Sequence, residues 1–179
     1  MRTLVAVAVL VMVAAASFAQ GGGYAAPEGS SQAFRVKAGY ADVGDLGGAF
    51  TAAIEYSTPE FVVTAGWADA KGTLRSGLNV FEFDGDQYFL EAGYTYRPPS
   101  NPLTYIGLGA GWYRLDGDFQ QTQPVPGVSS GHDDSAGAFV VVGTESGDRR
   151  WFCEVRWVVG TDHWDWTADG LRAYVGMRF

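Results

Sequence analysis

The chain ends in the segment Leu171-Arg172-Ala173-Tyr174-Val175-Gly176-Met177-Arg178-Phe179, in which every odd position is apolar. The even positions carry Arg, Tyr, Gly and Arg. Side chains of a β-strand alternate between two faces, so this period of two predicts a strand with one apolar and one charged face. The segment therefore predicts a sheet with one oily surface and one surface that holds charges.

The same alternation recurs upstream and predicts seven further strands. They are expected at residues 34–40, 50–56, 61–67, 88–96, 103–113, 136–145 and 151–159. In the sixth of these the run from Phe139 to Val142 is apolar throughout, so the facing of that strand stays open. No segment has a convincing helical period, and the fold class predicted is all-β with eight strands.

The connections between these strands alternate in length. Residues 57–60, 97–102 and 146–150 are short turns, whereas residues 69–86, 115–135 and 161–170 are long and polar. Ten of the thirteen aspartates fall in these long connections, two lie in the first connection, of intermediate length, and only Asp148 lies in a short turn. We expect residues 115–135 to be a loop, residues 78–83 to extend a hairpin, and Asp84-Gly85-Asp86 and Asp116-Gly117-Asp118 to form turns. Such parity is typical of an antiparallel transmembrane barrel with long outer loops and short periplasmic turns.

A sheet in hydrocarbon must close on itself, because each unpaired backbone group costs several kcal/mol there. Eight strands form a small barrel whose interior is filled by side chains. The predicted inner set contains both charge signs, which suits internal pairing of buried charges. Its members are Arg35, Lys37, Glu55, Glu91, Glu154, Arg156, Arg172 and Arg178. Inner glycines are expected to leave room for these long side chains.

The amino terminus reads as a secretory signal peptide. Arg2 precedes an apolar core of 13 residues, and Ser17-Phe18-Ala19 supplies the small residues of a cleavage site. We therefore expect a signal peptide at residues 1–19, cleavage near Ala19, a flexible lead-in at residues 20–32 and a barrel domain at residues 33–179. The net charge of −8 argues against nucleic acid as a partner, and the single Cys153 permits no internal disulfide.

Together these features resemble the small outer-membrane barrels of the OmpA transmembrane-domain and OmpX kind. The resemblance implies an eight-stranded antiparallel up-and-down barrel in the outer membrane of a Gram-negative-type bacterium. It also implies contact with outer-membrane lipid and lipopolysaccharide, and a C-terminal signal read by the barrel-assembly machinery. That signal comprises Leu171, Ala173, Val175, Met177 and Phe179. The implied role is structural or surface-interacting, with a ligand bound through the outer loops and a narrow solute path through the interior.

Two groups of residues carry a weaker suggestion of chemistry. Gly127-Val128-Ser129-Ser130-Gly131 matches a nucleophile-elbow pattern, but that motif requires a strand before it and a helix after it. His132, His163, Asp133, Asp134, Asp162 and Asp165 lie in two outer loops without the spacing of a zinc motif. The two Asp-Gly-Asp motifs do not continue as a calcium loop would. We therefore expect no catalytic residue, no metal site and no cofactor.

Two alternative functions remain open at this point. A secreted, lipocalin-like ligand-binding barrel uses the same alternation with inverted facing, apolar inside and charged outside. A lipid A-modifying outer-membrane enzyme requires a Ser or His on the outer rim with a base beside it. His163, flanked by Trp164 and Trp166, is the nearest candidate for such an enzyme.

Overall fold

The computed structural model describes residues 32–76, 79–123, 127–163 and 166–179. The predicted signal peptide and residues 20–31 of the lead-in lie outside this part of the chain, as do Trp164 and Asp165. The elements are β1 (Ala33–Asp42), η1 (Gly44–Leu46), β2 (Gly48–Ser57), β3 (Phe61–Ser76), β4 (Asn79–Tyr96), β5 (Thr104–Gln123), β6 (Gly127–Glu145), β7 (Trp151–Val159), β8 (Asp162–His163), β9 (Trp166–Thr167) and β10 (Gly170–Arg178).

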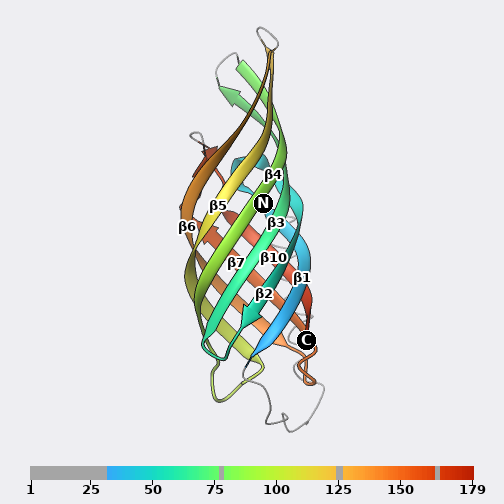
Figure 1. Cartoon of the computed structure of the whole chain (residues 1–179), viewed down its shortest axis with the longest axis vertical. Coiled ribbons are helices and arrows are strands. Elements are labelled where there is room, and N and C mark those ends of the chain that lie inside the picture. Colours follow the sequence, from blue (N-terminus) through green and yellow to red (C-terminus); the bar gives the residue numbers. More distant parts are fainter. Residues whose placement is uncertain (1–31, 77–78, 124–126, 164–165) are drawn as a thin grey trace.

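Eight of these strands form one closed barrel in the order β1-β10-β7-β6-β5-β4-β3-β2, and all neighbours are antiparallel (Figure 1). The ring closes where β10 pairs with β1, with Met177 opposite Val36. Beyond the last pair, Phe179 N donates to Phe34 O over 2.8 Å. The predicted eight-stranded antiparallel up-and-down transmembrane barrel is confirmed. No helix in the described ranges is long and apolar enough to cross a membrane.

The two faces of the barrel wall are opposite in character. The outer face exposes large apolar side chains, among them Phe34 at 65%, Leu108 at 66% and Trp157 at 58% exposure. The inner face buries Arg, Lys and Glu. A soluble lipocalin-like barrel needs the reverse facing, so that alternative is wrong.

Strand β6 shows which way its apolar run faces. Val140 and Val142 are exposed, whereas Phe139 and Val141 are buried. All four residues are paired with both β5 and β7. This pairing determines the facing of β6, which four consecutive apolar residues did not reveal.

The prediction of a loop at residues 115–135 is wrong, because β5 and β6 continue through most of it. Pairing extends to Gln120 opposite Val128 and Gln121 opposite Gly127. The turns expected at the two Asp-Gly-Asp motifs are also wrong, since these motifs lie directly opposite each other in β4 and β5. Ladder pairing outweighs the low strand preference of Gly and Asp. Strands β3 to β6 consequently rise above the other strands in Figure 1.

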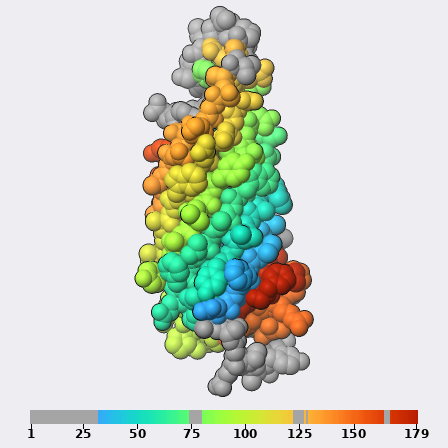
Figure 2. Space-filling model, viewed as in Figure 1, coloured from blue at the N-terminus to red at the C-terminus, as the bar shows by residue number. Residues whose placement is uncertain are grey.

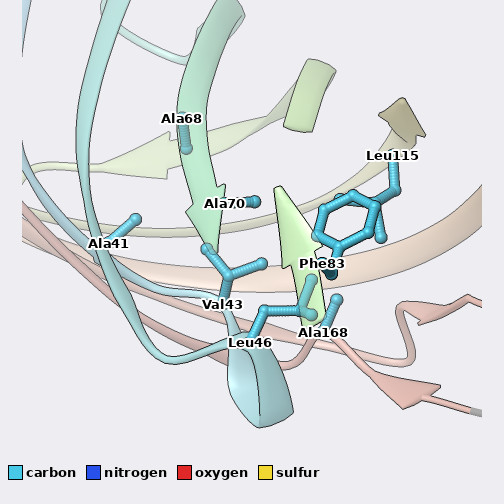
Figure 3. Packing of buried hydrophobic residues seen from close by; sticks show 8 residues of the cluster. All are labelled: Ala41, Val43, Leu46, Ala68, Ala70, Phe83, Leu115 and Ala168. Carbon is cyan, nitrogen blue, oxygen red and sulfur yellow. The ribbon is translucent and has the colours of Figure 1, made fainter. Parts of the chain in front are cut away.

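An apolar cluster closes the lumen near the end that carries the long hairpins. The connection from β1 to β2 folds inward through η1 and brings Val43 and Leu46 onto the inner faces of β3 to β5 (Figure 3). Gly44 and Gly47 adopt φ of 58° and 81°, conformations that L side chains rarely take, and so permit this fold. We term this cluster the apolar cap; it comprises Ala41, Val43, Leu46, Ala68, Ala70, Phe83, Leu115 and Ala168.

Candidate functional site

The structure brings most of the predicted inner charges together in the middle of the barrel. Seven of the eight are at most 3% exposed: Arg35, Lys37, Glu55, Glu91, Glu154, Arg156 and Arg172. The eighth, Arg178, lies at the turn end of the barrel with its side chain 18% exposed.

Lys37 links two walls of the barrel. Its Nζ lies 2.7 Å from Glu55 Oε2 on β2 and 2.6 Å from Glu154 Oε1 on β7. Thr64 Oγ1 donates a further bond of 2.9 Å to Glu55 Oε2. A buried charge is tolerated only when it is paired and hydrogen-bonded, and each group here meets that condition.

Two arginines cross the lumen to Glu91 on β4. Arg156 of β7 donates to Glu91 Oε2, and Arg172 Nη1 of β10 lies 3.0 Å from Glu91 Oε1. Arg156 Nη2 also contacts Glu55 and Glu154, at 3.2 and 3.1 Å. Because these side chains reach across the ring from opposite strands, they fill the interior at this level.

Sequence reasoning missed the residue that organises the turn end of the interior. Glu145 accepts hydrogen bonds from Arg35 and from Arg97, the latter over 2.7 Å, and its Oε2 lies 3.8 Å from Arg178 Nη1. The sequence did not place Glu145 inside the barrel, because the facing of β6 could not be assigned from its apolar run. The alternation Phe139, Val141, Gly143, Glu145 would have placed it inside.

The space at inner glycines is occupied by aromatic rings as well as by the charged side chains that the sequence predicted there. A Cβ on Gly66 would lie 2.3 Å from Phe89 Cζ, and one on Gly143 would lie 2.3 Å from Tyr105 Cζ. The rings in turn support the guanidinium groups: Arg172 Cζ lies 4.2 Å from the centroid of Phe89. Cation–π contact of this kind stabilises a desolvated arginine. The interior is thus a layered packing of charges and rings.

A second distinctive region is the outer face of the long hairpins. Directly above the aromatic pair Trp67 and Tyr88, the next cross-strand row is Asp69, Asp86 and Asp116. We term the segments 69–76, 79–86, 116–123 and 127–134 the projecting sheet. Among the side chains that the structure describes, its outer side, the acidic face, carries seven carboxylates and one cation, Lys71, with Arg114 next to it in β5. The carboxylates are those of Asp69, Glu82, Asp84, Asp86, Asp116, Asp118 and Asp134.

Of the described side chains, Lys71 and Arg114 neutralise the acidic face only in part, and Arg114 Nη2 lies 3.8 Å from Asp116 Oδ2. Lys71 Nζ lies 3.2 Å from Asp84 Oδ1 and 3.9 Å from Asp69 Oδ1, and hydrogen bonding to Asp84 raises the pKa of Lys71. Between Asp84 and Asp118, and between Asp86 and Asp116, like charges stand directly opposite, an arrangement that destabilises a sheet. A shallow cavity of about 610 Å³ opens here, lined in part by Lys71, Asp84 and Asp118.

The residues considered for catalysis or metal binding are not assembled into such a site. Gly127–Gly131 lies inside β6, without the strand-to-helix turn of a nucleophile elbow. His132 is exposed on the outer face, whereas His163 is buried with Nδ1 3.8 Å from Asp133 Oδ2. Across the described ranges no group of three or more His, Cys, Asp or Glu side chains is arranged to hold a metal ion.

Comparison with known proteins identifies likeness of fold. No protein-family model and no curated protein sequence matches this chain. Among solved structures, Ail, the attachment invasion locus protein of Yersinia pestis in complex with the heparin analogue sucrose octasulfate, is 15% identical, with a TM-score of 0.50. The match covers 84% of this chain and all of Ail. Neisserial surface protein A is 17% identical with a TM-score of 0.50, covering 85% of this chain and 100% of that protein.

Proposed function

We propose that this protein is a bacterial outer-membrane barrel that holds the acidic face above the membrane to bind a cationic polypeptide. The barrel wall supports the location: an apolar exterior, an aromatic row and then an abrupt change to aspartate mark where hydrocarbon meets water. Ail and neisserial surface protein A share the fold of this chain. The long hairpins then face the outside and the short turns face the periplasm.

The observation that carries the binding proposal is the register of β4 and β5. It places Asp84 opposite Asp118 and Asp86 opposite Asp116, all on one exposed side. The inner side of the same strands is already covered by the apolar cap. A bound basic ligand lowers the repulsion between these opposed aspartates. Its binding is therefore expected to stabilise the projecting sheet.

The same charge argues against the ligand class seen with Ail. Sucrose octasulfate is a polyanion, and bringing it to seven carboxylates is electrostatically unfavourable. We therefore expect this chain to share the barrel of Ail without sharing its affinity for sulfated sugars.

The binding proposal is tested with the barrel refolded in phosphatidylcholine vesicles and a fluorescent lysine-rich peptide. Asp84→Asn, Asp116→Asn and Asp118→Asn together are expected to weaken binding about tenfold, since each exposed ion pair contributes about 0.5 kcal/mol. The matched control is Glu60→Gln with Asp148→Asn, which removes carboxylates from the turn end. Equal affinity in the triple variant and the control contradicts the proposal, as does tight binding of heparin.

The interior supports a closed barrel rather than the narrow solute path that the sequence suggested. Arg156 and Arg172 reach Glu91 across the lumen, and the apolar cap lies above them. Moving an ion through this layer requires breaking buried ion pairs, which leaves charges without compensation.

For assembly, we infer that the C-terminal strand is read by the barrel-assembly machinery. Leu171, Ala173, Val175 and Met177 share the outer side of β10, and Phe179, which follows the strand, is 73% exposed. Deleting Phe179 is expected to reduce insertion in cells while leaving refolding in detergent intact. Unimpaired insertion, measured by the heat-dependent gel shift of outer-membrane fractions, contradicts this inference.

A further inference from the structure

An apolar groove marks the outer wall near the short turn between β6 and β7. It has a volume of about 250 Å³, and its floor is the cross-strand row Thr144, Cys153 and Val175. The ring of Trp151 forms one wall. These floor residues are small beside the tryptophan, so they leave a furrow in an otherwise bulky outer face.

The end of the barrel below this groove is rich in arginine. The turn carries Arg149 and Arg150, and Arg178 N donates to Arg150 O over 2.8 Å, which brings the end of β10 beside it. Arg35 and Arg97 share the single carboxylate of Glu145 with Arg178. Figure 2 shows the red end of β10 next to orange segments at the lower end of the molecule.

This positive charge is only partly balanced locally. Four guanidinium groups, those of Arg97, Arg149, Arg150 and Arg178, lie at this end with the carboxylates of Glu145 and Asp148, while Arg35 shares Glu145 and is also paired with Glu55 at 3.0 Å. Asp148 is engaged within the turn, where it accepts from Ser146 Oγ and from Arg150 N. The rim next to the groove is therefore an attractive position for an anion.

We propose that an anionic glycerophospholipid of the periplasmic leaflet binds here, one acyl chain in the groove and its phosphate at Arg149 and Arg150. The inference rests on the proposed orientation, in which the turns face the periplasm. Hydrocarbon chains are what an apolar groove in the membrane wall meets, and guanidinium groups bind phosphate with paired hydrogen bonds. A net negative headgroup suits the excess positive charge of the rim.

The structure offers variants that separate headgroup from chain recognition. Arg149 has φ of 56°, a conformation that asparagine also adopts, so Arg149→Asn removes the charge without straining the turn. Cys153→Leu fills the groove, with Thr144→Leu as a second filler. Ala110→Leu, at an exposed position of the β5 outer face, adds the same kind of bulk away from the groove.

The test uses the barrel refolded in phosphatidylcholine vesicles with a minor fraction of phosphatidylglycerol. Either lipid carries brominated acyl chains, which quench nearby tryptophan, and the Trp151 contribution is the difference from Trp151→Phe. We expect brominated phosphatidylglycerol to quench Trp151 more strongly than the same mole fraction of brominated phosphatidylcholine. Arg149→Asn should lower this preference about fivefold, the effect of one arginine near an anionic surface.

Each arm of the experiment has a defined outcome. Both groove fillers should reduce quenching while Ala110→Leu does not, with folding checked by the heat-dependent gel shift. Equal quenching by the two lipids overturns the proposal, and so does loss of the preference on adding inorganic phosphate, which indicates a site for free anions. A barrel that binds basic peptide normally but shows no lipid preference refutes this inference alone.

Discussion

At the scale of single residues, Glu91 connects side chains from opposite walls of the barrel interior. It accepts from Arg156 and Arg172 and from Tyr113 Oη, the last over 2.8 Å. Each partner comes from a different strand, so this carboxylate joins β4 to β5, β7 and β10 through the lumen. A network of this kind is not itself a large source of stability, but removing one member leaves buried charge without compensation.

We therefore expect Glu91→Gln to destabilise the barrel by about 3–5 kcal/mol. The free energy of unfolding is measured by urea titration of protein refolded in vesicles, followed by tryptophan fluorescence. Glu60→Gln, an exposed position in the β2–β3 turn, is the matched control. A loss no greater than that of the control indicates that Arg156 and Arg172 find other partners.

His163 gives the β8–β9 segment a pH dependence. Burial lowers its pKa below the ordinary value of 6.5, although Asp133, Asp134 and Asp162 act in the opposite direction. The folded segment thus prefers neutral histidine. As pH falls below about 6.5, the locally unfolded segment takes up the proton more readily, and the stability of the folded form decreases.

Hydrogen exchange of residues 160–169 measures this effect after correction for intrinsic rates. Protection is expected to be lower at about pH 5.5 than at about pH 7.5, because the unfolded histidine titrates between them. His163→Asn should remove the difference, whereas His132→Asn, at an exposed position of β6, should retain it. A pH effect that persists in His163→Asn assigns the titration to another group.

At the scale of elements, glycine and aromatic residues decide how closely neighbouring strands pack. In β4 and β5, Gly85 lies opposite Gly117, and the ring of Phe83 lies over both, with Cζ 2.8 and 2.7 Å from where their Cβ atoms would be. Ring-over-glycine packing lets the wide projecting sheet bend over the apolar cap. It also explains why an Asp-Gly-Asp motif, normally a turn signal, remains in a strand here.

Two glycines of β6 provide a direct test of this packing. An added Cβ at Gly143 meets the Tyr105 ring at 2.3 Å, whereas at Gly127 it meets nothing within 4 Å. Gly143→Ala is expected to cost about 1–3 kcal/mol through overpacking, and Gly127→Ala to be neutral or slightly stabilising. Urea unfolding in vesicles compares them; equal effects would falsify the view that rings fill the glycine positions.

At the scale of the whole molecule, charge is divided between the two ends of a closed barrel. The acidic face lies at the hairpin end and the arginine-rich rim at the turn end, with balanced ion pairs between them. This arrangement suits a protein that presents opposite charge to the two sides of its membrane. The interior separates the two ends and does not connect them.

The closed interior predicts an absence of conductance. Refolded protein in a planar bilayer is expected to show no channel steps in concentrated salt, because Arg156, Arg172 and Glu91 fill the lumen. Glu91→Gln with Arg172→Met serves as the comparison, since it removes two of these groups. Regular conductance steps in the unmodified protein contradict the closed barrel, provided that the heat-dependent gel shift shows it to be folded.

The sequence by itself determined the strands and their facing wherever apolar and polar residues alternate. Alternation is a local property, so β10, β7 and the inner positions of Lys37 and Arg156 could be read without knowing any partner. The alternation could not assign the facing of β6, because the four residues from Phe139 to Val142 are all apolar. The inward position of Glu145 in the same strand was therefore not predicted.

Only the tertiary structure decided the length of the hairpins, the acidic face and the groove. The sequence of residues 115–123 and 127–135 is typical of a loop because Gly and Asp have low strand preference, yet pairing across β4 to β6 keeps these residues extended. The acidic face depends on register, and the groove depends on Thr144, Cys153 and Val175 meeting from three strands. Such juxtapositions are set by closure of the barrel, which no local pattern encodes.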